Sequence, residues 1–225
     1  MRRTRRGCAA ARVALAAALA IPPAAALAGA QIEEELSANV QSSLQRSVSD
    51  YPAPHLVFST DAEGRAWLAE MSSRLAAKIP DWPTRRDFLV TVQYEAARAG
   101  LDAQLVLALI QQESNFRKYA VSSASARGYM QVMPFWVRLI GTPDHDLFNL
   151  RTNLRYGSTI LRYYLDRENG DLFRALGRYN GSLGQPEYPD AVLATLQRYW
   201  TWRPALASGG AAEPARLDVN ASNSR

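Results

Sequence analysis

Cysteine and histidine are nearly missing from this sequence, and their scarcity excludes several kinds of chemistry. The 225 residues contain one cysteine, Cys8, and two histidines, His55 and His145. Zinc sites draw their ligands mainly from these residue types, so the sequence predicts no metal site. Ser-His-Asp catalysis would have to use one of the two histidines, and no Gly-x-Ser-x-Gly motif is present. We expect both histidines to lie on the solvated surface.

A phosphate-binding loop and a basic surface are missing as well. The segment Gly128 to Gln131 lacks the lysine and the additional glycines of such a loop. The chain has 26 Lys and Arg against 21 Asp and Glu, but residues 1–30 hold five arginines and no acid, which leaves 21 of each sign from residue 31 onward. A formally neutral chain has no electrostatic reason to bind nucleic acid. The sequence therefore predicts neither a cofactor nor a nucleic-acid partner.

The first 30 residues have the pattern of a secretory signal peptide. Arginines near the start precede an apolar run over residues 13–21, and small residues follow at 26–30. The run is shorter than the about 20 residues that span a bilayer, so it predicts an export signal and not a transmembrane helix. Cleavage after Ala28 or Ala30 fits this pattern. We expect a periplasmic protein that has no transmembrane segment and, since Cys8 is removed, no disulfide.

Apolar residues recur with helical spacing along most of the remaining chain, and no segment alternates with a period of two. The predicted helices cover residues 31–48, 61–78, 84–99, 103–114, 135–140, 153–168, 171–179 and 190–202. The residues after 204 have the composition of a disordered tail. The sequence thus predicts an all-α protein divided into a signal peptide (1–30), a helical N-terminal extension (31–83), a catalytic domain (84–203) and a disordered tail (204–225).

One carboxyl group has an unusual predicted environment. Glu113 follows Leu109 by four residues and Ile110 by three, so a helix places it on an apolar face. It also lies near the C-terminal end of that helix, where the helix dipole disfavours negative charge. Both effects raise the pKa of a carboxyl group, and a carboxylic acid with a raised pKa can protonate a glycosidic oxygen. Taken alone, the position fits a solvated helix end better than a catalytic acid.

Three further motifs change this interpretation. The segments ESNF at 113–116, GYMQVMP at 128–134 and RYNGS at 178–182 occur in this order, with Gln131 eighteen residues after Glu113. Together they resemble the soluble lytic transglycosylases, lysozyme-like bacterial enzymes that cleave peptidoglycan. The resemblance covers about residues 84–203 and implies a lysozyme-like helical domain. Tyr129 stands where that family usually has leucine, and Arg178 where it usually has alanine.

The resemblance implies a role for each motif. Glu113 would protonate the oxygen that links N-acetylmuramic acid to N-acetylglucosamine. It would then take the proton of the muramic acid's own C6 hydroxyl, which closes on C1 to give a 1,6-anhydro end. Tyr179 would face Glu113 with its hydroxyl near the developing charge. The implied substrate-binding residues are Ser122, Met130, Gln131, Tyr179 and Asn180, and the implied partner is the glycan strand of peptidoglycan.

Two other functions are compatible with parts of the pattern. A hydrolytic muramidase needs a second carboxylate or a positioned water, and the nearest acids downstream, Asp144 and Asp146, lie in a turn-rich stretch typical of a solvated loop. A catalytically silent glycan-binding protein would not need the acid and the Gln131 motif together. Residues 31–83 carry no motif, and could brace the catalytic helices or dock a protein partner of a cell-wall or secretion machine.

Overall fold

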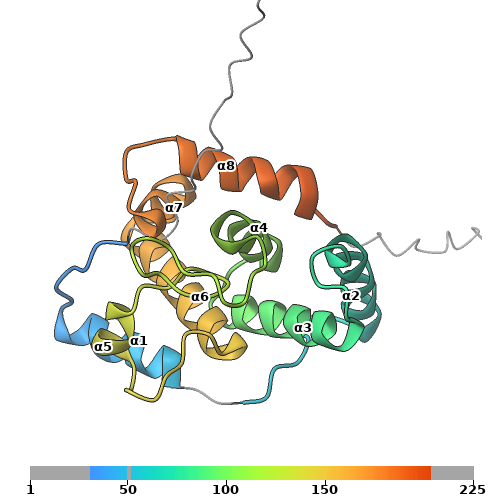
Figure 1. Ribbon diagram of the computed structural model, residues 1–225, viewed down its shortest axis with the longest axis horizontal. Coiled ribbons are helices and arrows are strands. Elements are labelled where there is room, and N and C mark those ends of the chain that lie inside the picture. Colours follow the sequence, from blue (N-terminus) through green and yellow to red (C-terminus); the bar gives the residue numbers. More distant parts are fainter. Residues whose placement is uncertain (1–30, 50–51, 204–225) are drawn as a thin grey trace, which may run out of the picture.

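The computed structural model describes residues 31–49 and 52–203. These residues form eight α-helices and one π-helix (Figure 1). In chain order they are α1 (Ala38–Ser49), α2 (Asp61–Leu75), α3 (Trp82–Arg98), α4 (Ala103–Ser114), α5 (Phe135–Ile140), α6 (Leu150–Arg167), α7 (Leu172–Asn180), α8 (Glu187–Thr195) and the π-helix η1 (Leu196–Trp200). The predicted all-α class is confirmed, whereas the predicted signal peptide and disordered tail lie outside the described residues.

Short polar side chains set the starts of most helices. Asp81, Asp102, Asn149 and Asp171 each accept a hydrogen bond from a backbone N–H in the first turn of α3, α4, α6 and α7. These bonds satisfy donors that have no partner inside the helix. The limits of α2 to α7 consequently agree with the predicted ones to within three residues.

The predicted helix 31–48 is wrong at its start, because α1 begins only at Ala38. Residues 31–37, here called the N-terminal strap, have no regular secondary structure, and Ile32 is 64% exposed. Polar contacts fix the N-terminal strap instead of an apolar helix face. The indole Nε1–H of Trp136 donates to Gln31 Oε1 at 2.9 Å, and Glu33 pairs with Arg138 at 3.0 Å.

The predicted helix 190–202 is wrong in its start and in its type. It begins at Glu187 and changes to the π-helix η1 at Leu196. The wider π turn brings the indole Nε1–H of Trp200 to 2.8 Å from Gln111 Oε1 in α4. A π-helix is rare and is retained where it satisfies a specific contact, and this hydrogen bond fastens the last helix to the central one.

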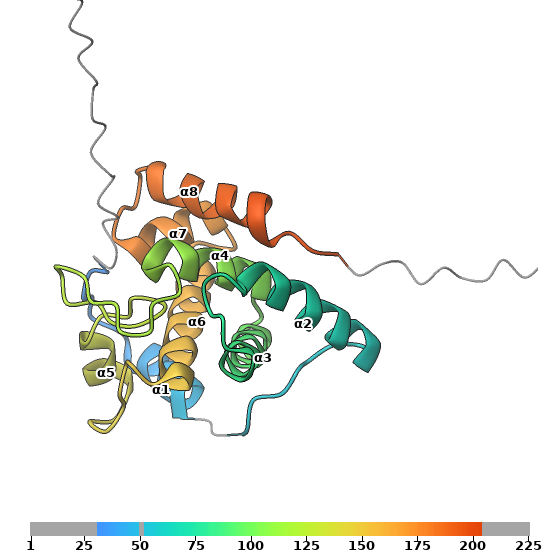
Figure 2. The ribbon, with the colours of Figure 1, turned by 45° about the vertical axis from the view of Figure 1, so that its right-hand side comes forward.

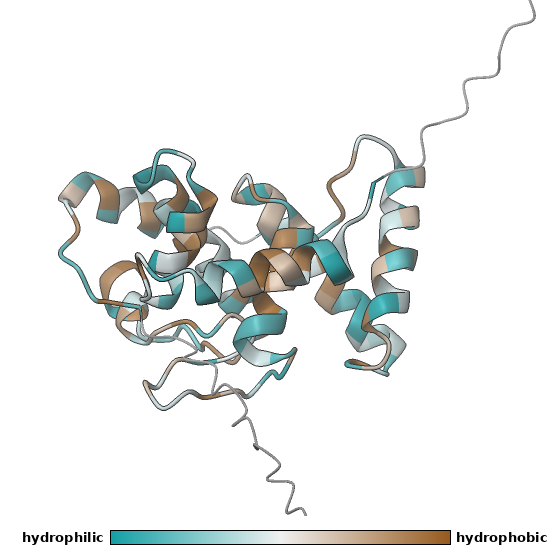
Figure 3. Cartoon of the chain, turned by 90° about the horizontal axis from the view of Figure 1, so that it is seen from above, coloured by the Kyte–Doolittle hydropathy of each residue, from teal (hydrophilic) through white to brown (hydrophobic). Residues whose placement is uncertain are grey.

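Helix α4 is the centre of the molecule. Figures 1 and 2 show it surrounded by α3, α6, α7 and α8. Every residue from Leu105 to Ile110 is buried, as expected of a helix that is covered on all sides. The outer helices expose one polar face each, so teal and brown alternate around them in Figure 3. Within the described residues, none of the helices is both long enough and apolar enough to span a membrane.

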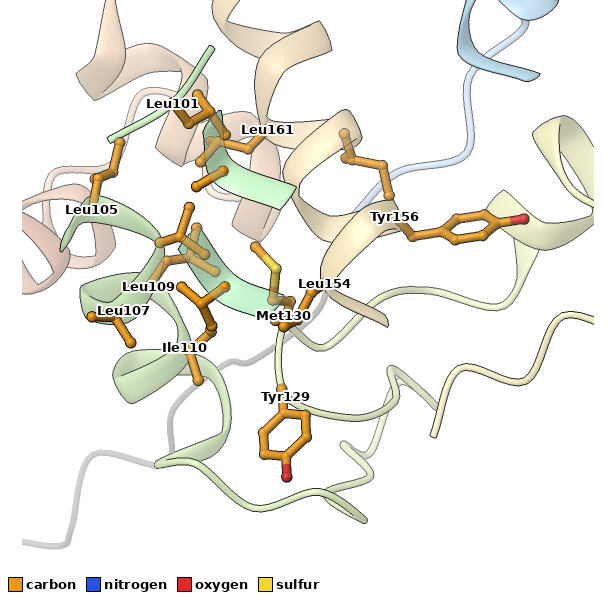
Figure 4. Close-up of a cluster of buried hydrophobic side chains, with 14 of the residues drawn as sticks. Leu101, Leu105, Leu107, Leu109, Ile110, Tyr129, Met130, Leu154, Tyr156 and Leu161 are labelled. Atoms are coloured by element: carbon orange, nitrogen blue, oxygen red, sulfur yellow. The ribbon is translucent and has the colours of Figure 1, made fainter. Parts of the chain in front are cut away.

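One continuous cluster of apolar side chains joins all of these elements. Figure 4 shows part of it, in which the leucines of α4 lie with Met130 and Leu154. Side chains of the N-terminal helices belong to the same cluster, among them Leu44 of α1 and Trp67 of α2. The helices that precede residues 113–182 are therefore packed on the same core as the three sequence motifs.

A buried ion pair links the two helices that flank α4. Glu95 of α3 is 1% exposed and lies 2.9 Å from Arg155 of α6, with Arg98 at 3.2 Å.

Of the two histidines, His55 is exposed as predicted, but His145 is half-buried. Its Nδ1 lies 2.7 Å from the hydroxyl of Tyr156, which holds it against α6.

Candidate active site

Glu113 lies in the last turn of α4, and its side chain points into the protein. The helix ends because Asn115 adopts a left-handed backbone conformation, with φ of 50°. The Glu113 side chain is 5% exposed, and burial raises its pKa from 4.5 to about 8. The expected rise of the pKa is therefore found, and its dominant cause is desolvation of the anion.

A tyrosine of α8, Tyr188, contacts the carboxyl group of Glu113. Its hydroxyl donates a hydrogen bond to Glu113 Oε1, which partly counteracts the rise in the carboxyl pKa. Helix α8 carries Tyr188 and is fastened to α4 by a 2.5 Å hydrogen bond from Gln112 Nε2 to Thr195 Oγ1. Glu113 Oε2 is buried and has no hydrogen-bond partner among the described residues. One oxygen of the carboxyl group is thus oriented, and the other is available.

Tyr188 could not be selected from the sequence. It follows the RYNGS motif by several residues and lies 75 residues from the acid that it contacts. A single tyrosine in the first turn of the last helix gives no local signal that distinguishes it from the other nine tyrosines. Only the packing of α8 on α4 brings it to the carboxyl group.

Tyr179 lies nearby but uses its hydroxyl differently from the expectation. The side chain is fully buried, and its O–H donates to the backbone carbonyl of Met130 at 2.8 Å. Burial raises the pKa of Tyr179 well above its usual value, and the charge of Glu113 adds to the rise. The tyrosine is therefore within electrostatic reach of the acid, although the phenol that donates to the carboxyl group belongs to Tyr188.

The turn at residues 128–131 depends on a glycine and on one buried amide. Gly128 has φ of +75°, and a Cβ there would lie 2.4 Å from Asn153 Nδ2. Asn153 is fully buried in α6 and makes three hydrogen bonds of 2.8 Å. It accepts from the N–H of Met130 and donates to the carbonyls of Arg127 and Leu147. One side chain thus holds the turn and the segment after α5 together.

Gln131 and Met130 lie inside the protein rather than at its surface. Gln131 is 1% exposed, and its Nε2 donates to the carbonyls of Ala120 at 3.1 Å and Gly128 at 2.9 Å. The Met130 side chain is fully buried against Gly157 of α6, where a Cβ would lie 2.3 Å from its sulfur. Both side chains hold the loop over 115–134 in place, and the Met130 carbonyl is the group that contacts Tyr179.

The remaining two predicted site residues lie at the edges of this arrangement. Ser122 is half-buried, and its Oγ accepts a 3.1 Å hydrogen bond from the N–H of Ala126. Asn180 is 4% exposed and is the last residue of α7, which ends at the left-handed Gly181. Ser122 is thus used in its own turn, while Asn180 is next to Tyr179 in the buried end of α7.

The two downstream aspartates are both exposed. Thr142 donates to Asp144 at 2.5 Å, and this hydrogen bond lowers the pKa of the Asp144 carboxyl group. Asp146 accepts from the N–H of Phe148 at 2.8 Å. Each carboxylate caps a turn of its own loop, as the sequence predicted for a solvated segment.

Comparisons with known proteins agree with the sequence motifs. Residues 91–188 match the family described as "Transglycosylase SLT domain". Proteins named "Membrane-bound lytic murein transglycosylase C" are similar to this chain. The one from Mannheimia succiniciproducens is 37% identical over 84 residues, which cover 37% of this chain and 21% of the relative. That of Yersinia pestis is 38% identical over 82 residues, 36% of this chain and 21% of the relative. The chain thus matches about a fifth of the length of these relatives.

A solved structure of lytic transglycosylase Slt from Pseudomonas aeruginosa, an inactive mutant, was also found. It covers 76% of this chain and 35% of its own, with 18% identity and a TM-score of 0.39. The family match extends from the middle of α3 to Tyr188 and contains Glu113, the turn at 128–131 and Tyr179. Residues 91–188, somewhat less than half of the chain, are therefore similar to the Transglycosylase SLT domain family.

Proposed function

We propose that this protein is a peptidoglycan lytic transglycosylase, a lyase that acts in the periplasm. It cleaves the β-1,4 bond between N-acetylmuramic acid and N-acetylglucosamine and leaves a 1,6-anhydromuramic end. The family match and the names of the relatives support the class of enzyme. The observation that carries the mechanism is the buried carboxyl group of Glu113, with its pKa raised to about 8, one oxygen held by Tyr188 and the other without a partner.

In the first step, Glu113 acts as a general acid. A carboxyl group with a pKa of about 8 is mostly protonated at neutral pH, so its proton is available for transfer. The proton moves to the glycosidic oxygen as the bond from that oxygen to C1 of the muramic acid breaks. N-acetylglucosamine leaves with a hydroxyl group, and positive charge develops at C1, where the substrate's acetamido group can stabilise it.

In the second step, the Glu113 carboxylate acts as the base. It accepts the proton of the C6 hydroxyl while that oxygen bonds to C1, which closes the anhydro ring and restores the neutral acid. The carboxylate exists only between the two steps. The hydroxyl of Tyr188 donates to it and stabilises the charge during that interval. Glu113 is therefore the catalytic residue, and Tyr188 orients it and partly offsets the rise of its pKa.

A hydrolytic muramidase is the second function that the scaffold would allow. A hydrolase of this kind uses a second carboxylate or a positioned water in addition to the acid. The carboxylates of Asp144 and Asp146 bond to groups of their own loop. A mechanism with a single carboxyl group fits Glu113 better.

Digestion of purified peptidoglycan tests the proposal. Mass spectrometry of the released fragments should find anhydro ends, which are lighter by one water than the reducing ends made by a hydrolase. Glu113→Gln should abolish their formation, whereas Glu63→Gln on α2 should not change it. Fragments with reducing ends would identify a muramidase, and absence of release would refute enzymatic cleavage. Unchanged anhydro products from Glu113→Gln would refute the proposed role of the acid.

A further inference from the structure

Two cations and two apolar side chains of the loop that carries Ser122 are exposed, and they lie beside the half-buried Phe148 of the segment after α5. The group consists of Lys118, Tyr119, Val121, Arg127 and Phe148, here called the aromatic platform. Tyr119 is 71% exposed and Val121 60%, and the rings of Tyr119 and Phe148 lie 5.8 Å apart between centroids. The Lys118 ammonium lies 5.1 Å from the Tyr119 ring, and the Arg127 guanidinium 5.9 Å from the Phe148 ring. Exposed apolar side chains that lie together, rather than singly, mark a candidate binding surface.

The aromatic platform is held in place by the same groups that hold the turn at 128–131. The carbonyl of Ala120, next to Tyr119, accepts from the N–H of Gly128 at 2.9 Å and from Gln131 Nε2 at 3.1 Å. Arg127 exchanges two backbone hydrogen bonds of 3.0 Å with Val132. These bonds fix Tyr119 and Arg127 relative to the active-site turn, so a ligand on the platform has a defined position.

Phe148 is held from the other side. The carbonyl of Leu147, its neighbour, accepts from Asn153, and the N–H of Phe148 donates to Asp146. The same Asn153 side chain binds the Arg127 carbonyl. The two halves of the aromatic platform come from segments about twenty residues apart in the sequence, and one buried amide joins them. The surface is therefore preorganised, which lowers the entropy cost of binding.

The charges of the aromatic platform indicate the kind of ligand. Lys118 and Arg127 form no ion pair with a carboxylate of the described residues. By contrast, Arg138 pairs with Glu33, and Arg178 pairs with Glu168. A ligand that complements this surface has an apolar face for the rings and a carboxylate for the cations. A sugar ring presents its C–H face to an aromatic ring, and the peptide stems of peptidoglycan carry carboxylates.

We propose that the aromatic platform is a glycan subsite that binds a saccharide unit of the peptidoglycan strand, with a carboxylate of its peptide stem at Lys118 and Arg127. This inference rests on the proposed function, because it assigns the same polymer to a second part of the loop. Tyr119 precedes Ser122 by three residues, so one loop serves both the platform and the implied substrate-binding position. The subsite adds affinity at a distance from the reacting bond.

Sedimentation with insoluble peptidoglycan tests the subsite. All variants are made in the full chain that carries Glu113→Gln. Binding to intact peptidoglycan is measured by sedimentation, and binding to the glycan strands that remain after an amidase has removed the stems is measured by titration calorimetry. Tyr119→Ala should weaken binding to both by about three- to tenfold, since it removes one aromatic contact. Lys118→Gln should weaken binding to intact peptidoglycan only.

Tyr199→Ala is the matched control. Tyr199 is 45% exposed and has the Arg198 guanidinium 5.2 Å from its ring. Tyr199 lies in η1, at the end of α8 that is near α2 (Figures 1 and 2). The loop over 115–134 lies on the other side of the molecule, toward α5 (Figures 1 and 2). Removal of the Tyr199 ring should leave binding unchanged. Equal binding by Tyr119→Ala and Tyr199→Ala would overturn the subsite, and equal loss by Lys118→Gln on both kinds of peptidoglycan would overturn the assignment of the stem carboxylate.

The two proposals fail in different measurements. If the parent protein released no anhydro fragments but Tyr119→Ala still weakened sedimentation, the proposed function would fail and the subsite would stand. If the parent released these fragments and Tyr119→Ala bound like the parent, the subsite alone would fail.

Discussion

Replacing Glu113 by glutamine should stabilise the protein, and the gain should grow with pH. In the folded protein the pKa of Glu113 is about 8, against an ordinary value of 4.5. Between these pH values the folded protein keeps a proton that the unfolded chain has lost, so the free energy of unfolding falls as the pH rises. The slope is about 1.4 kcal/mol per pH unit, and the whole interval amounts to at most about 5 kcal/mol. Glutamine does not ionise, and its amide oxygen can accept the Tyr188 hydrogen bond, so the variant avoids this loss.

Guanidinium denaturation of both proteins from pH 4.5 to pH 8, the two pKa values, measures the effect. The difference in unfolding free energy should be smallest at the acid end, where the folded protein is protonated and the unfolded chain is about half protonated. It should rise steadily and reach its maximum at the alkaline end. Glu63→Gln, on α2, should run parallel to the parent at every pH. A constant difference between Glu113→Gln and the parent would refute the conclusion that the acid is buried and protonated at neutral pH.

Three further predictions concern the surroundings of the acid. The rate of anhydro-product formation should fall as the pH rises through about 8, where Glu113 loses its proton. The Tyr188 hydrogen bond lowers the pKa of Glu113, so Tyr188→Phe should move this fall in rate to higher pH. A move to lower pH would contradict the assigned contact. Asn153→Ala removes three hydrogen bonds from buried groups. Chemical denaturation should show that the free energy of unfolding falls by roughly 3 kcal/mol or more. A fall of less than about 1 kcal/mol would contradict the role of Asn153 in holding the turn. Gly157→Ala places a Cβ 2.3 Å from a buried methionine sulfur and should cost about 1–3 kcal/mol and reduce activity. Gly170 has open space around it but a φ of +87°, so Gly170→Ala should lower the free energy of unfolding by about 1 kcal/mol and leave the activity unchanged. Equal activities of Gly157→Ala and Gly170→Ala would count against a role for the packing of Met130 on Gly157.

The parts of the fold that depend on neighbours in sequence could be predicted. Helix α4 has its predicted limits because Asp102 caps it and its apolar residues are continuous. Ile32 and Leu36 continue the apolar spacing of α1, and this local pattern predicts a helix over the N-terminal strap. The contacts that prevent this helix lie far away in sequence, as Trp136 is 105 residues from Gln31. No local pattern reports a contact of that kind.

The candidate site shows the same division. Helical periodicity, which is local, places Glu113 on an apolar face, but taken alone it fits a solvated helix end better. The spacing of Glu113 to the later motifs is what singles it out as the candidate acid. Tyr188 meets the acid across 75 residues, and Asn153 meets Met130 across 23. Their amino-acid types are common, and only tertiary packing gives them a specific partner. The sequence therefore predicts which residue carries the charge, but not which residues hold it in position.

The three hydrogen bonds of Asn153 also bear on how this domain can be recombined. Its amide joins the turn at 128–131, the carbonyl of Arg127 and the segment that ends at Leu147, so these pieces are not independent modules. A loop exchanged between relatives carries its own backbone geometry and needs a matching residue on α6. Insertions and deletions between Asn115 and Leu147 should accordingly be tolerated only where they leave the three carbonyl and amide positions at the same distance from one side chain.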